Sequence, residues 1–244
     1  LHLGVEALGA ACWGLGVAAW ALNDAEAALR AWMAFLVLTI AGERRELMQM
    51  RRLPRGVRVG FVVVVGVALA AVLLGLMDAL AGTAGRTAAA VLWWVACAAL
   101  ALWLLRWDFA PRQWAAPQWP GHTAQCLSVG YGWLGIAALL GLAGLAGVPT
   151  ATQAAGHALW LGFVFAMVFG HAPIILPALA RWRPAYVPWA RWAIVLLSAS
   201  LVLRVVGSIA GHAAAQAWAG AGHALAIVWF ALAMVTGLWA GRRT

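Results

Sequence analysis

Six histidines are the residues of this chain best suited to chemistry, and five of them share a local pattern. Each of the five follows a glycine and lies near the end of an apolar run: His122, His157, His171, His212 and His223. A neutral imidazole is the commonest axial ligand of haem iron and a good ligand for copper. Because glycine has no side chain, a bulky group such as a porphyrin can approach the backbone beside it. The pattern therefore predicts that these imidazoles bind haem or a metal ion.

Two of these histidines, His157 and His171, are fourteen residues apart on one expected helix. At ~100° and 1.5 Å per residue they lie within ~40° of one face and ~21 Å apart along the axis. The face between them is apolar, and the spacing resembles the fourteen-residue histidine pairs of membrane b-type cytochromes. The expected cofactor is therefore haem b, at one or two sites, with copper as a candidate additional cofactor.

Partners for this pair follow from depth in the membrane. His122 is expected at the inner level with His171, whereas His212 and His223 are expected at the outer level with His157. We predict His223 as the outer partner because the apolar run 224–235 should continue as helix, whereas residues 213–219 should be more mobile. Arg204, also at the outer level, is a candidate partner for a haem propionate.

Other functions fit the same histidines. Helix-end histidines often hydrogen-bond loop backbone, and a transporter or channel could line a proton or metal route with them. Such a transporter would have broken helices, and Pro173 and Pro177 interrupt the sixth apolar run. A non-catalytic subunit of a larger respiratory complex would instead present small residues such as Gly141, Gly144 and Gly147 to its partner. A quinone or a protein could serve as redox partner.

The elements that must position these residues are membrane helices. Hydrophobic residues make up 66% of the 244-residue chain and charged residues 9%, a composition that only a lipid bilayer can solvate. The expected fold is all-α, a polytopic transmembrane bundle of about eight spans forming one domain over residues 1–244. Because the chain opens with Leu1 inside an apolar run, we expect the native protein to have residues before it. The eight predicted spans are 3–22, 28–42, 59–82, 87–105, 124–146, 156–179, 190–210 and 221–240.

Charge gives the orientation. All sixteen basic residues are arginines, and thirteen of them fall on one side of an eight-span topology. Only Arg30, Arg86 and Arg204 fall on the other. The positive-inside rule then places both ends of the chain in the cytoplasm. The absence of a basic stripe or an RNA-binding aromatic motif argues against nucleic acid as a partner.

Few other side chains suggest chemistry. The three cysteines are not spaced as C-x-x-C, which excludes zinc ribbons, iron–sulfur clusters and covalent haem attachment. Glu6 and Asp78 lie inside predicted spans, where we expect helix-to-helix pairing. Tyr131 is the one phenol expected at mid-membrane, and we expect it to be packed rather than to carry a proton or a radical.

The segment from His157 to Pro177 resembles a helix of the NnrS family. The shared features are the histidine, the pair Gly162-Phe163 five residues later, Gly170 near the end of the span, and a closing proline. Members of this family are polytopic bacterial membrane proteins associated with haem, copper and the nitric oxide response. The resemblance implies a haem-binding protein of the bacterial inner membrane, with His157 as a ligand, that acts in electron transfer or nitric oxide handling.

Overall fold

A computed structural model describes residues 2–48, 52–82, 84–180 and 185–241. These residues form helices and short connections, with no β-strand among them. Eight helical segments are long and apolar enough to cross a membrane, which confirms the all-α transmembrane fold and the eight predicted spans. By internal contacts the chain divides into two compact units, unit 1 (residues 1–104) and unit 2 (residues 105–244). A single domain over the whole chain stays a prediction.

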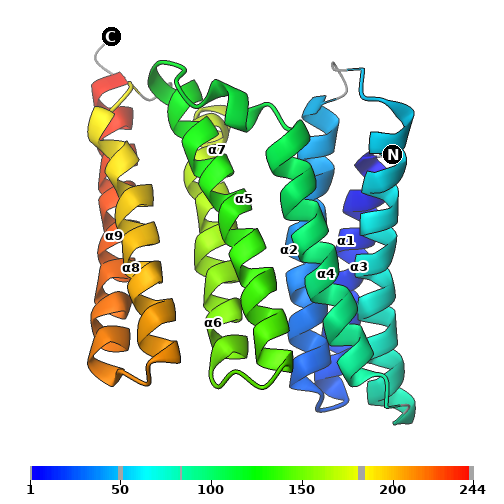
Figure 1. The fold of residues 1–244 in the computed structure, drawn as a ribbon. Helices are drawn as coiled ribbons and strands as arrows, with labels where there is room; N and C mark the ends of the chain where they lie inside the picture. The colour runs from blue at the N-terminus through cyan, green and yellow to red at the C-terminus, as the bar shows by residue number, and fades with distance from the viewer. Residues whose placement is uncertain (1, 49–51, 83, 181–184, 242–244) are drawn as a thin grey trace. The chain divides into compact units, whose positions relative to one another are not determined.

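Unit 1 contains four long helices (Figure 1), namely α1 (His2–Ala21), α2 (Ala25–Leu47), α3 (Arg55–Ala81) and α4 (Arg86–Trp107). Helices α1 and α2 form an antiparallel hairpin, and a short turn with Asp24 as the N-cap joins them. Glu6 of α1 packs against Gly42 of α2, where any side chain would collide with it. One oxygen of Glu6 is buried without a hydrogen-bond partner, so the expected helix-to-helix pair is not formed by that atom.

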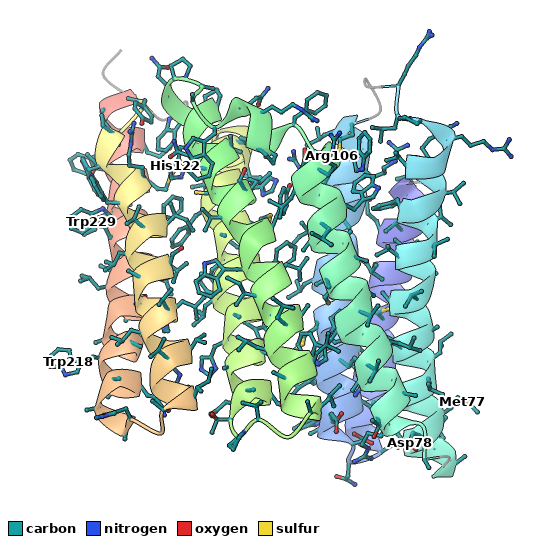
Figure 2. The ribbon with its side chains drawn as sticks, in the orientation of Figure 1. Met77, Asp78, Arg106, His122, Trp218 and Trp229 are labelled. Carbon is teal, nitrogen blue, oxygen red and sulfur yellow. The ribbon has the colours of Figure 1, made fainter. Side chains whose placement is uncertain are left out.

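Charged residues gather at the end of unit 1 that carries the α1–α2 turn. Arg86 donates to Asp24 at 2.8 Å and to Asp78 at 3.3 Å, which joins the starts of α2 and α4 to the end of α3. Arg30, which is 6% exposed, donates to Glu26 at 2.7 Å. Asp78 therefore pairs with a charged residue of another helix, as the structural interpretation predicted. Figure 2 shows Asp78 at this end of the unit.

Unit 2 contains the remaining helices (Figure 1). The transmembrane ones are α5 (Gln118–Leu145), a sixth span made of α6 (Ala151–His157), a π-helix (Ala158–Val164) and α7 (Phe165–Ala180), then α8 (Arg191–Ile209) and α9 (Ala213–Gly241). Short 3₁₀ helices precede α5 and α8, at Ala110–Gln113 and Pro188–Ala190. Three described arginines, Arg106, Arg112 and Arg191, mark what we call the arginine-rich end, where α5 and α8 begin.

Glycines let the helices of unit 2 approach closely. A Cβ on Gly162 would lie 2.6 Å from Trp133 Cβ of α5 and 2.9 Å from a methyl group of Leu201 in α8. A Cβ on Gly144 would meet Thr152 of α6, and Gly147 has φ +90° in the turn that follows α5. Gly144 therefore serves helix packing inside unit 2, and Gly147 serves the turn that follows α5.

Two predicted boundaries in unit 2 are wrong. Helix α9 begins at Ala213, eight residues before the predicted span, so residues 213–219 are helical and not a mobile stretch. Alanine is the best helix former, and it extends this helix beyond its most apolar window. The sixth span is not interrupted at Pro173 or Pro177, because α7 continues through both. Its irregular part lies earlier, in the π-helix.

Candidate functional site

The π-helix changes the relation between His157 and His171. Residues 158–164 make i→i+5 hydrogen bonds, whereas the predicted shared face assumed a regular α-helix. A π-helical turn accommodates about one extra residue, which rotates the following residues by about 100°. The two imidazoles therefore lie roughly 140° apart around the axis instead of ~40°, and the prediction that they share one face is wrong. π-Helical turns occur frequently at functional sites.

The structure brings His157 together with His223 and Arg204. His157 ends α6, Arg204 lies near the end of α8, and His223 lies in α9, ~15 Å along the helix from Ala213. Both His157 and Arg204 lie close enough to the His223 ring to act on it electrostatically, so the three residues are neighbours. We call these three residues the outer cluster. The pairing of His157 with His223 as ligands stays a prediction.

The two histidines of the outer cluster differ in their ring contacts. Nδ1 of His157 lies 2.9 Å from the Gln153 carbonyl oxygen. A metal-bound histidine usually donates its other ring N–H to a carbonyl or carboxylate, so this contact suits the tautomer of His157 in which the lone pair of Nε2 is free to bind a metal. The Nε2 atom of His223 is buried and has no hydrogen-bond partner.

Arg204 has spare hydrogen-bonding capacity. One Nη1–H donates to the Gln216 carbonyl oxygen at 3.3 Å, whereas the buried Nε has no partner. The side chain of Gln216 in turn donates to the Gly207 carbonyl, which holds the end of α8 against α9. A half-buried guanidinium with an unused N–H can bind a carboxylate in two-point geometry.

His212 has a different environment. It is exposed in the turn between α8 and α9, and its backbone N–H donates to the Gly207 carbonyl at 2.8 Å. Gly211 before it has φ +68°, a conformation that a residue with a side chain rarely adopts. The glycine at this position is therefore explained by the turn. Of the two candidates for the outer partner, only His223 is buried and in a helix.

His122 lies near the arginine-rich end, as Figure 2 shows. Its ring is 2% exposed, and Nε2 lies 3.2 Å from the Phe169 carbonyl and 3.5 Å from the Cys126 sulfur. The ring stacks on Phe230 at 6.0 Å and meets Trp119 edge-on. His122 is therefore part of an aromatic core that joins α5, α7 and α9, although its Nδ1 is buried without a partner.

His171 does not join His122. Its half-buried ring has Nδ1 2.7 Å from the Met167 carbonyl of its own helix. Among the described residues, the hydrogen-bond and ring partners of His122 do not include His171. The predicted pairing of His171 with His122 stays a prediction.

Four of the five glycines that precede histidines have a role in packing or a turn. A side chain at Gly121, Gly170 or Gly222 would collide with Ala116, Leu127 or Ser200, respectively, and Gly211 makes the turn described above. Gly156 is different, because nothing lies within 4 Å of the position of a Cβ there. Gly211 also has nothing within 4 Å of that position, but its positive φ already accounts for the glycine, so Gly156 is the one of the five that neither packing nor a turn explains.

A family model for a domain of unknown function (DUF8744) matches residues 1–238. The chain belongs to this family. Among curated proteins and solved structures, nothing matches the chain. The DUF8744 match covers both units, so the outer cluster lies inside the region that defines the family.

One buried polar pair in this DUF8744 chain was not predicted from its sequence. Asp108, fully buried just after α4, accepts a hydrogen bond from the hydroxyl of the fully buried Tyr131. Arg112 donates to the Asp108 carbonyl at 3.0 Å. The signal available in the sequence was an acidic residue at the end of an apolar run. Its partner is 23 residues away, and only the fold brings the two together.

Proposed function

We propose that unit 2 binds one b-type haem through His157 and His223, and that the protein transfers electrons within a membrane. The observation that carries the proposal is the buried, unpartnered Nε2 of His223 beside His157 and Arg204. A buried polar atom without a partner costs about 1–3 kcal/mol, and bonding to an iron atom would remove that cost. No other pair of histidines in the described residues has this arrangement.

The number of protein ligands favours haem over a bare metal ion. Zinc and copper sites generally use three or four protein ligands. Within the described residues there is no group of three His, Cys, Asp or Glu side chains that could hold such an ion. Haem supplies four nitrogen donors itself and needs only one or two axial ligands from the protein. Two imidazoles are therefore sufficient for haem and insufficient for a typical copper site.

The surrounding residues suit the edges of a haem. The unused Nε–H of Arg204 is a hydrogen-bond donor for a propionate carboxylate, and its positive charge compensates the charge of that group. At Gly156, beside His157, no atom lies within 4 Å of the position of a Cβ, so a ring held by His157 would meet no side chain at that point. When bound, the haem supplies one-electron chemistry, and the protein sets its potential through the two imidazoles and the apolar helices.

If both His157 and His223 held the haem iron, the site would favour electron transfer over the binding of a small gas. Nitric oxide or carbon monoxide needs an open coordination position, which paired imidazoles do not leave. Handling of nitric oxide, suggested by the resemblance to the NnrS family, would require that only one of the two histidines binds the iron. Binding of carbon monoxide therefore distinguishes the two functions in the test below.

The test is a haem titration of the purified protein followed by its visible spectrum. Because loss of a group that only orients a ligand already costs 10–100-fold in affinity, we expect His157→Ala and His223→Ala each to weaken haem binding by about tenfold or more. His212→Ala, in the exposed turn, is the matched control and should bind haem like the parent chain. The reduced parent protein should not bind carbon monoxide, whereas haem retained by His223→Ala should bind it.

Several results would contradict the proposal. Haem binding that is unchanged in both His157→Ala and His223→Ala would show that the site lies elsewhere. Carbon monoxide binding to the parent protein would show a five-coordinate haem and would favour gas handling. Stoichiometric copper with no haem would favour a metal centre.

A further inference from the structure

A second feature of unit 2, unrelated to the outer cluster, is a groove between α5 and α8 near the arginine-rich end. Its volume is about 320 Å³, within the range of pockets that hold small molecules. Trp192 and Val195 on its α8 side are 57% and 51% exposed, so the groove opens to the surface of the unit. In a membrane protein such a surface is accessible to lipid.

The charge on the α8 wall of the groove lies at one end. Arg191, Val195 and Ser198 are spaced by four and three residues and so lie on one helix face, over ~10 Å. Arg191 lies at the start of α8, Val195 is one turn deeper, and the Ser198 hydroxyl beyond it accepts a hydrogen bond from Trp133. The α5 wall has Gln125 followed by Val129. The groove is therefore charged at its mouth and uncharged further in, with Val129 and Val195 as its apolar walls.

The charge at the mouth is positive and has no acidic counterpart in the groove. Arg191 is exposed, and one of its N–H groups donates to the Tyr186 hydroxyl at 2.7 Å, which leaves other donors unused. None of the described side chains that line the groove is acidic. Trp114 and Trp192 flank the mouth, as tryptophans do at the level of lipid headgroups.

We propose that this groove binds one anionic phospholipid, with the phosphate at Arg191 and an acyl chain along Val129 and Val195. The complementarity of a positive mouth with an apolar interior fits a lipid that carries net negative charge. Basic pockets between transmembrane helices bind anionic headgroups in this way. A zwitterionic lipid also has a phosphate, but it brings its own cationic group to the same mouth, and a neutral quinone has no charge to compensate that of Arg191.

Native mass spectrometry of the detergent-solubilised chain tests the proposal. Phosphatidylglycerol and phosphatidylcholine are added in separate samples at the same ratio of lipid to protein, and the lipid molecules retained on each protein are counted. We expect one retained phosphatidylglycerol, bound about fivefold more tightly than phosphatidylcholine, as one basic residue near a headgroup provides. Arg191→Gln should reduce the preference to near unity. Arg106→Gln, an exposed arginine that does not line the groove, should leave it unchanged.

A second pair of variants separates the groove from general charge attraction. Val195→Trp should fill the groove and lower phosphatidylglycerol retention while Arg191 is kept. Val202→Trp is the matched control, because Val202 is equally exposed on α8 at 52% but lies outside the groove. Equal retention of the two lipids by the parent chain, preferential retention of a quinone, or parent-like retention by both Arg191→Gln and Val195→Trp would overturn the proposal.

Discussion

At the scale of single residues, the structure gives each histidine a different environment, which their shared sequence pattern did not predict. The depth of His157 and His223 follows from the order of the spans, so their proximity could be predicted. The π-helix after His157 could not be predicted, because no sequence motif specifies i→i+5 hydrogen bonding in an apolar segment. The core position of His122 was also missed, since its neighbours Phe169 and Phe230 come from two helices distant in the sequence.

The pair formed by Tyr131 and Asp108 leads to a stability prediction at this scale. Tyr131→Phe removes a hydrogen bond to a buried carboxyl group, and such bonds contribute about 1.5–3 kcal/mol. We expect a lower unfolding temperature in detergent by several degrees. The only other tyrosine provides a matched control: Tyr186→Phe removes an exposed bond from Arg191 and should change stability by less than about 1 kcal/mol. Equal unfolding temperatures of the two variants would show that the buried bond contributes little.

At the scale of helices, hydropathy located every span but misplaced several ends. A hydropathy window marks the most apolar part of a helix, whereas the helix itself continues as long as the backbone is favoured to do so. The alanine-rich start of α9 is one example, and α6 is another, since it begins at Ala151 before the predicted 156. The close packing of the spans could not be predicted, because it depends on which small residue of one helix contacts which residue of its neighbour.

Two glycines of the sixth span test that packing. Gly162→Ala would place a methyl group 2.6 Å from Trp133 Cβ, which should destabilise the protein by about 1–3 kcal/mol through overpacking. Gly156→Ala meets nothing within 4 Å and should be neutral or stabilise by up to about 1 kcal/mol, because alanine favours helix. Thermal unfolding of the haem-free variants measures both. A parent-like unfolding temperature for Gly162→Ala would show that α5 and the sixth span are not in close contact there.

At the scale of the whole molecule, charge and hydropathy were enough to predict the class of protein. Eight spans and the clustering of arginines at one end of each unit both appear in the structure. Arg51, Arg181, Arg183, Arg242 and Arg243 lie outside the described residues. The division into two compact units was not predicted, because no polar linker marks residue 104.

Cysteine labelling in intact cells tests the orientation of each unit separately. A membrane-impermeant maleimide should label Thr87→Cys in unit 1 and His212→Cys in unit 2, which are exposed at the arginine-poor ends. Arg55→Cys and Gln113→Cys, exposed at the arginine-rich ends, should react only after the cells are broken. The three native cysteines are buried and should contribute little background. Outside labelling of Arg55→Cys would show that unit 1 has the opposite orientation.

Three of the helices are longer than a bilayer requires. Helices α3, α5 and α9 contain 27, 28 and 29 residues, or about 40–44 Å, against a hydrocarbon thickness of ~30 Å. The excess must be taken up by tilt or by ends that reach into the headgroups, at a cost of a fraction of a kcal/mol per Å of mismatch. Because His223 lies on α9 and His157 on the sixth span, a change in tilt would move one imidazole relative to the other. The thickness of the membrane would therefore affect the distance between the two proposed ligands.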